Sequence, residues 1–143
     1  MIGKTIDELS VGERAELSKT ISESDVYLFA GITGDLNPAH VNERYARQTR
    51  FGRRVVHGML LGGLISSVLA NQLPGPGTIY VEQRLEFLAP VFIGDTVTAR
   101  VEVLSKSDDG KRVTLETVVL GDDGAEVVRG SAVVSPPRRP RAS

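Results

Sequence analysis

The sequence contains no cysteine and no tryptophan, and only two of its 143 residues are histidine. Without cysteine the chain has no disulfide, no zinc–thiolate site and no cysteine nucleophile, and a reducing, cytoplasmic location is expected. Its charges nearly cancel, since 17 lysines and arginines stand against 18 aspartates and glutamates. This balance provides no basic footprint for a nucleic acid, so no nucleic-acid partner is expected.

The sequence also lacks a long hydrophobic run. Its most apolar stretch, residues 59–70, is interrupted by glycine and serine. It is shorter than the roughly 20 apolar residues that a membrane-spanning helix requires. A secretory signal carries an apolar run after its first basic residues. The first residues of this chain, MIGKTIDELSVGERAEL, contain no such run after the first lysine. We therefore predict a soluble protein without a membrane partner.

The remaining composition is that of one globular domain. Hydrophobic residues make up 41% of the chain and charged residues 24%, and the length suits a single core. We predict one domain over residues 1–135. Residues 136–143, PPRRPRAS, are rich in proline and arginine and are predicted to form a disordered, solvated tail.

Three helices are predicted in the first half of the chain. Ser22 and Asp25 form a capping pattern at the start of the first helix, and Gly34 ends it. Pro38 follows Asn37 and suits the first turn of a second, short helix. The third helix covers residues 55–73, where apolar residues at helical spacing have no charged face beside them. It should therefore be buried on most sides, until the LPGPG segment ends it.

The second half of the chain alternates apolar and polar residues with the period of β-strands. Turn signals at 108–110 and 121–124 separate the last three strands, which should form an antiparallel meander. A sheet that curls round one long buried helix is an α+β fold. Its exposed edge strands favour edge-to-edge pairing of two copies, which predicts a homodimer. The residues predicted to share strand faces are Ile79, Val81, Leu85 and Phe87; Val97, Ala99, Val101 and Val103; Val113, Leu115, Thr117 and Val119; and Val128, Ala132 and Val134.

Asp35 and His40 are the strongest candidates for chemistry. They lie in the segment GDLNPAH, five residues apart across an Asn-Pro turn. Such a turn can bring a carboxylate and an imidazole to one water molecule, and the two groups suit general acid–base catalysis. Spacing alone leaves an alternative open, in which Asp35 caps the helix that begins at Pro38 and His40 is a surface residue.

A second candidate lies at the start of the long helix. The first N–H groups of a helix have no partner within it, and Gly58 lets a carbonyl oxygen approach closely, as in an oxyanion hole. Gly58 can equally serve helix packing, and His57 can contact a substrate or be structural. Ser66 lies eight residues later, near the same helix face, where it can contact a substrate or bond a carbonyl one turn back. Ser67 lies on a different face.

Other classes of site find little support. The chain has no Gly-x-Ser-x-Gly elbow and no phosphate-binding P-loop. Asp35, His40 and His57 are three possible metal ligands, but nothing in the sequence indicates residues to orient them, and no metal is predicted. The arginines of the segment Arg50 to Arg54 can receive phosphates or form a solvated charged loop.

Two motifs together resemble a known family. GDLNPAH at 34–40, followed by HGMLLGGLISS at 57–67, resembles the MaoC-like family, specifically its (R)-specific enoyl-CoA hydratases. FLAPVFIGDTVTARVEV at 87–103 is similar to that family's strand pair. The resemblance covers nearly the whole chain. It implies the hotdog fold, a curved antiparallel sheet wrapped around a long central helix, in a dimer with the acyl–pantetheine chain entering at the interface.

The resemblance also implies an activity and its residues. The expected reaction is the reversible addition of water to trans-2-enoyl-CoA, giving (R)-3-hydroxyacyl-CoA, as in fatty-acid or polyhydroxyalkanoate metabolism. By position, Asp35 and His40 would hold the water and Gly58 N–H would polarise the thioester. Ser66 would lie near the catalytic residues, and Asn37 would shape the loop. No cofactor is implied, because coenzyme A or phosphopantetheine arrives as the carrier of the substrate.

Two residues depart from the family pattern. Ala39 stands where a larger aliphatic residue is common and Asn42 where an acidic residue is common, but neither touches the expected chemistry. Three alternative functions remain open. They are a (3R)-hydroxyacyl-carrier-protein dehydratase subunit, a hotdog thioesterase and a non-catalytic acyl-thioester-binding domain. The sequence does not distinguish the acyl-chain length, the carrier or the physiological direction.

Overall fold

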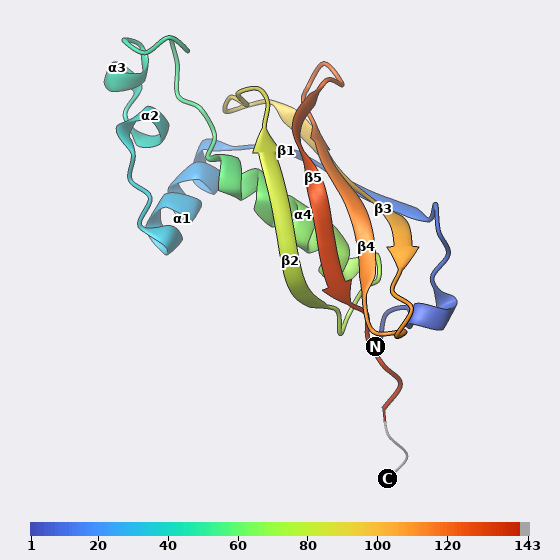
Figure 1. The fold of residues 1–143 in the computed structure, drawn as a ribbon. Helices are drawn as coiled ribbons and strands as arrows, with labels where there is room; N and C mark the ends of the chain where they lie inside the picture. Colours follow the sequence, from blue (N-terminus) through green and yellow to red (C-terminus); the bar gives the residue numbers. More distant parts are fainter. Residues whose placement is uncertain (141–143) are drawn as a thin grey trace.

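The computed structural model describes residues 1–140 and shows one curved antiparallel sheet with a long helix against it (Figure 1). The five strands are ordered β1-β3-β4-β5-β2 across the sheet. The strands are β1 (Arg14–Thr20), β2 (Ile79–Phe87), β3 (Thr96–Lys106), β4 (Val113–Leu120) and β5 (Glu126–Ser135). The helices are the 3-10 turn η1 (Ile6–Glu8), α1 (Glu23–Thr33), α2 (Pro38–Val41), α3 (Glu43–Ala46) and α4 (Gly58–Asn71).

The sheet and α4 form the core. The inward residues of β3 and β4 are fully buried, and α4 packs its apolar side against them. Burial of each such aliphatic side chain stabilises the fold by roughly 1.5–3 kcal/mol. The predicted strand faces are confirmed for β3, β4 and β5, as is the α+β arrangement of a curved sheet around one long helix. The buried helix residues are Leu60, Leu61, Gly62, Ile65, Val68 and Leu69.

One face of α4 is not covered by the sheet. Met59 is 59% exposed, and Gly63 and Ala70 are exposed as well. This face lies beside β2, an edge strand that pairs only with β5 among the strands of residues 1–140. The strand and the helix face expose several large apolar side chains together. The predicted homodimer stays a prediction.

The loop geometry before α4 follows from local capping. Ser22 Oγ accepts a hydrogen bond from Asp25 N–H (3.1 Å), and Gly34 ends α1 with a φ of 78°, so both predictions are confirmed. Asn37 Oδ1 accepts from Ala39 N–H (3.1 Å) and caps α2, with Pro38 in the first turn. The residue that caps the helix at Pro38 is therefore Asn37, and the alternative reading of Asp35 as its cap is wrong.

Three features of the sheet differ from the sequence-based expectation. The segment Arg14–Thr20, for which the sequence predicts no strand, forms edge strand β1 and pairs with β3. β2 pairs with β5, a partner that the turn signals in the sequence do not identify. A bulge between Tyr80 and Glu82 interrupts the regular alternation of side chains between the two faces of β2. Residues paired in register lie on the same face of the sheet, so the pairing with β5 shows which face each side chain of β2 occupies. The bulge places Ile79 opposite to Leu85 and Phe87, so these residues do not share one strand face as predicted.

The C-terminal segment begins inside the fold. Pro136 and Pro137 are buried, and Pro137 lies against Gly77. The division into a domain of 1–135 and a disordered tail of 136–143 stays a prediction, and residues 141–143 of that tail lie outside the described residues. Within residues 1–140, no helix combines the length and hydropathy that crossing a membrane would need.

Candidate active site

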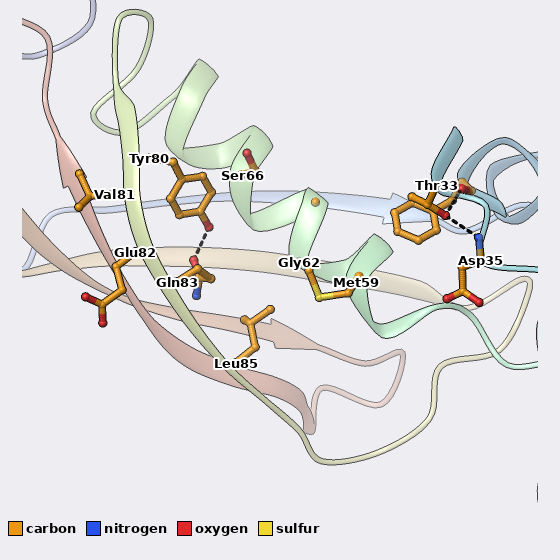
Figure 2. Close-up of a pocket in the computed structure, with 12 residues that line it drawn as sticks. Thr33, Asp35, Met59, Gly62, Ser66, Tyr80, Val81, Glu82, Gln83 and Leu85 are labelled. Carbon is orange, nitrogen blue, oxygen red and sulfur yellow. Dashed lines mark hydrogen bonds between the residues drawn. The ribbon is translucent and has the colours of Figure 1, made fainter. Parts of the chain in front are cut away.

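The loop after α1 presents Asp35 toward the N-terminal end of α4. Asp35 N–H donates to Thr33 Oγ1 (3.1 Å) (Figure 2). Asp35 Oδ1 accepts a hydrogen bond from Asn37 N–H (3.3 Å). The side chain is exposed, and its second carboxylate oxygen has no hydrogen-bond partner within residues 1–140. The loop therefore fixes the carboxylate while leaving one oxygen available to a ligand or a water molecule.

Two cavities meet at Asp35. The first, which we call the helix-face cavity, has a volume of about 650 Å³ and runs along α4 and β2. Its lining includes Met59, Gly62, Gly63, Ser66, Tyr80 and Leu85 (Figure 2). The second, the His57 cavity, has a volume of about 450 Å³, and its lining includes Arg50, Phe51, His57, Gly58 and Phe87. Because Asp35 and Met59 line both cavities, the carboxylate lies where a long, mostly apolar ligand would pass.

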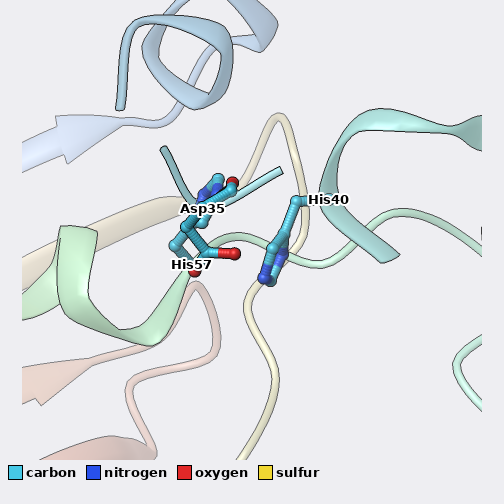
Figure 3. Close-up of side chains that lie close together, drawn as sticks. All are labelled: Asp35, His40 and His57. Atoms are coloured by element: carbon cyan, nitrogen blue, oxygen red, sulfur yellow. Dashed lines mark hydrogen bonds between the residues drawn. The ribbon is translucent and has the colours of Figure 1, made fainter. Parts of the chain in front are cut away.

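Asp35, His40 and His57 lie close together, as the sequence predicted for the first two. One ligand-capable atom from each side chain lies within 4.8 Å of the others (Figure 3). His40 is half-buried, and its Nδ1 lies 2.6 Å from the carbonyl oxygen of Val55. A carbonyl only accepts hydrogen bonds, so this contact places the proton of neutral His40 on Nδ1. The lone pair then sits on Nε2, where it can accept a proton.

His57 is buried and contacts the backbone of the loop that carries Asp35. Its side chain is 1% exposed, and its Nε2 lies 3.1 Å from the backbone carbonyl oxygen of Asp35. By the same reasoning, neutral His57 carries its proton on Nε2 and holds the Asp35 loop against the start of α4. Nδ1 is buried and has no hydrogen-bond partner among the described residues. The His57 ring stacks on His40 with centroids 3.8 Å apart and lies 4.8 Å from Phe29.

The stacking also bears on metal binding. The rings of His40 and His57 are nearly parallel, with an interplanar angle of 28°. Imidazole nitrogens bind a metal through lone pairs in the ring plane, so stacked rings direct these lone pairs alongside one another and not toward one point. One nitrogen of each ring already faces a carbonyl oxygen. The geometry favours proton transfer over a shared ion, and the prediction of no bound metal stays a prediction.

Gly58 is the first residue of α4 and faces the His57 cavity. No acceptor within residues 1–140 pairs with its N–H, as expected for the first turn of a helix. A Cβ at this position would lie 2.6 Å from the Phe87 ring. The absence of a side chain thus serves both packing against β2 and access to the N–H, so the two readings of Gly58 are compatible.

The other predicted residues occupy separate places. Ser66 lines the helix-face cavity, whereas Ser67 does not and accepts a hydrogen bond from Asn71 Nδ2 (3.3 Å). Asn37 caps α2 and shapes the loop.

The arginines of the segment 50–54 differ in their surroundings. Arg50 lines the His57 cavity, whereas Arg54 forms ion pairs with carboxylates and is not free to receive a phosphate. The Val55 carbonyl was not predicted, because no side chain at that position signals its role.

His57 should make the fold sensitive to acid. Burial lowers the pKa of His57 below its ordinary value of 6.5, despite the opposing hydrogen bond to the Asp35 carbonyl. Below pH 6.5 the unfolded chain therefore binds a proton that the folded chain excludes, and stability is lost as the pH falls. The loss attributable to this group is at most about 1.4 kcal/mol per pH unit.

The His57→Phe variant, which keeps a ring for stacking, tests this expectation. Urea unfolding at pH 7.5, 6.5 and 5.5 should show a smaller loss of unfolding free energy on acidification than in the wild type. Equal losses in both proteins would contradict the assignment to His57.

Comparisons with known proteins agree with this geometry. A family model described as "MaoC like domain" matches residues 9–124. The (R)-specific enoyl-CoA hydratase of Rhodospirillum rubrum is 53% identical over 133 residues, which covers 93% of this chain and 92% of that protein. The protein of the same name from Aeromonas caviae is 46% identical and covers 90% of this chain and 96% of its own length.

Solved structures give the same result. The A. caviae (R)-hydratase, described as involved in PHA biosynthesis, superposes with a TM-score of 0.88 at 46% identity, over 90% of this chain and 98% of that one. An unliganded R-hydratase from Pseudomonas aeruginosa has a TM-score of 0.90 at 41% identity, over 99% and 96% of the two chains. These likenesses extend over the sheet, α4 and the loop that carries Asp35 and His40, and the chain belongs to the MaoC-like domain family.

Proposed function

We propose that this protein is an (R)-specific enoyl-CoA hydratase, a hydro-lyase that reversibly adds water to trans-2-enoyl-CoA and forms (R)-3-hydroxyacyl-CoA. One observation carries the proposal: the Asp35 carboxylate, which lines an apolar cavity beside the N-terminal end of α4, lies within 4.8 Å of a ring nitrogen of His40. The relatives named (R)-specific enoyl-CoA hydratase support the reaction class.

The geometry leads to a simple mechanism. The thioester carbonyl accepts a hydrogen bond from Gly58 N–H, which draws electrons from the conjugated bond and makes C3 electrophilic. A water molecule held by Asp35 and His40 attacks C3. The acid–base pair removes one proton from that water and delivers one to C2, so the product carries the hydroxyl on C3 and the added hydrogen on C2. Dehydration follows the same path in reverse.

The substrate and the assembly complete the proposal. The acyl group lies in the helix-face cavity, whose lining is mostly apolar, and the pantetheine arm reaches the site past Phe87 in the His57 cavity. Coenzyme A arrives with the substrate, and no separate cofactor takes part. The proposal includes a cytoplasmic homodimer in which β2 and the uncovered face of α4 meet a second copy. The helix-face cavity lies along that edge, so a partner would enclose it.

A carrier-protein substrate is the second candidate. The tomato protein named 3-hydroxyacyl-[acyl-carrier-protein] dehydratase FERN, mitochondrial, is 33% identical over 131 residues, covering 90% of this chain and 78% of that protein. Its substrate would present the same thioester and pantetheine arm, so Asp35, His40 and Gly58 could serve both carriers. Comparison of kcat/KM for one acyl group on coenzyme A and on a carrier protein distinguishes them.

The proposed reaction is tested with purified protein and crotonyl-CoA. Loss of the enoyl-thioester absorbance without release of free thiol, together with formation of the (R)-3-hydroxybutyryl product, is expected. Thiol release would indicate a thioesterase instead. If crotonyl-CoA and longer enoyl-CoA or carrier-protein thioesters all remain unchanged, the proposal is wrong and a binding domain takes its place.

Ser66 provides a test of where the acyl chain lies. The Ser66→Leu variant adds bulk to the helix-face cavity, so kcat/KM should fall more for octenoyl-CoA than for crotonyl-CoA, by about tenfold in their ratio. Ser67→Leu is the control, because Ser67 does not line this cavity. The ratio is insensitive to partial unfolding, since unfolded protein lowers both rates equally. An unchanged ratio in Ser66→Leu would place the acyl chain elsewhere.

A further inference from the structure

Among the lysine and arginine side chains of residues 1–140, that of Arg54 donates the most hydrogen bonds to other side chains. Its side chain is only 11% exposed and contacts two helices. Toward α1, Nη2 donates to Glu23 Oε2 (2.6 Å) and Nη1 donates to Tyr27 Oη (2.9 Å). Toward α3, Nε donates to Glu43 Oε2 (3.0 Å). The guanidinium thus ties together helices that precede and follow the Asp35–His40 loop.

The next residue connects this clamp to the site. Val55 N–H donates to the Ala39 carbonyl (3.1 Å), and the Val55 carbonyl accepts from His40 Nδ1 (2.6 Å). Both contacts are made by the backbone, so the side chain at position 55 does not fix their geometry. What fixes it is the position of the strip formed by residues 54 and 55, which is also held by an isolated β-bridge between Val55 and Phe92. Arg54 is the member of that strip with side-chain anchors on both α1 and α3.

One helix that Arg54 joins, α3, and the neighbouring helix α2 have little support of their own. α2 and α3 have four residues each, and isolated helices of that length are unstable in water. In Figure 1 they lie beyond the end of α4, away from the sheet, together with the outer end of α1. Few buried apolar contacts hold this region, since Ala46 is the one buried residue of α2 and α3. The polar clamp is therefore a main constraint on where His40 lies.

We propose that Arg54 is a positioning residue for His40: by clamping α1 and α3 it fixes the Val55 carbonyl, which holds the imidazole with its proton on Nδ1. The inference rests on the proposed function, since it assigns His40 Nε2 as the proton acceptor. Arginine suits the task because its planar fork satisfies several acceptors at fixed angles, whereas lysine offers one ammonium on a flexible stem. Loss of the clamp should let the His40 ring rotate and exchange its proton between both nitrogens.

The test combines kinetics with nitrogen NMR of the histidine rings in full-length protein. Arg54→Met and Arg54→Lys are compared with Arg47→Met, a control on the same carboxylate, since Arg47 Nε lies 3.8 Å from Glu43 Oε1 and its side chain is 72% exposed. The chain has only two histidines, so selective labelling gives two rings to assign. In the wild type above neutral pH, we expect His40 protonated on Nδ1 and His57 on Nε2.

In Arg54→Met, kcat should fall about 10- to 100-fold with KM changed less than threefold, as expected when a catalytic group is displaced without loss of the substrate-binding cavity. The His40 nitrogen shifts should move to an average of the two tautomers, while His57 keeps its own. Arg54→Lys should show both effects less strongly and serves if the methionine variant fails to fold. Arg47→Met should show neither.

Two results would overturn the inference. One is a folded Arg54 variant whose His40 tautomer matches that of the control. The other is a wild-type His40 that is not protonated on Nδ1. These readouts do not depend on turnover, so they stay decisive if no enoyl thioester is hydrated. If none of the enoyl thioesters is hydrated but both histidines show the expected tautomers, the proposed activity is rejected and the role of Arg54 in holding His40 is retained.

Discussion

Replacement of Asp35 by asparagine should lower kcat by about 10² to 10⁴ while leaving the free energy of unfolding nearly unchanged. The large effect follows from loss of a group that holds the attacking water and shares its proton. The small structural effect follows from the exposed position of Asp35 and from its hydrogen bonds. Oδ1 accepts from Asn37 N–H at 3.3 Å, and an asparagine amide oxygen can accept the same bond.

Asp123→Asn is the matched control. Asp123 is also exposed, and its Oδ1 accepts from the N–H two residues ahead, that of Ala125 (3.0 Å), in the turn between β4 and β5. The same change of charge in the same kind of turn should therefore leave kcat unaltered. Both variants are measured by loss of enoyl-CoA absorbance and by urea unfolding. If Asp35→Asn retained kcat within threefold of the wild type, the acid–base role of Asp35 would be rejected.

The parts of the site that sequence could predict are the local ones. Ser22 and Asp25 lie three residues apart, and Asp35 and His40 five, so their geometry follows from a cap and a turn. The helical pattern of residues 55–73 likewise predicted α4, although the helix itself is shorter and spans Gly58–Asn71. In these segments the interactions that decide the structure lie within a few residues of one another.

The parts that sequence missed depend on distant partners. The edge strand β1 has only Ala15 and Leu17 as apolar residues, which is too weak an alternation to identify without β3 beside it. The pairing of β2 with β5 joins segments about 50 residues apart, and no local pattern selects it over pairing with β3.

The same limit applies within the site. Val55 bonds His40 through its carbonyl, which every residue carries, from 15 positions along the chain. Arg54 lies in a run of basic residues, and only the folded chain shows that it is bound by carboxylates while Arg50 lines a cavity. Residue type identified Asp35 and His40 as the candidate pair, but the groups that hold them in place come from backbone geometry and long-range ion pairs.

Gly130→Ala should have the largest effect on stability. Gly130 lies in β5 opposite β2, and a Cβ there would come within 1.7 Å of the Arg84 carbonyl oxygen and 2.7 Å of its carbonyl carbon. These are backbone atoms, so no side-chain rotation can relieve the overlap, and the two strands must separate. We expect a loss of about 3 kcal/mol of unfolding free energy, measured as a lower urea midpoint.

Gly31→Ala provides the control, because a Cβ at Gly31 in α1 meets nothing within 4 Å. Alanine has the higher helix propensity, so this variant should be more stable by up to about 1 kcal/mol. The two results together test the pairing of β2 with β5, which forms one wall of the helix-face cavity through Tyr80, Gln83 and Leu85. If Gly130→Ala unfolded at the wild-type midpoint, β2 would not lie in this register, and the wall against which we place the acyl chain would have to be redrawn.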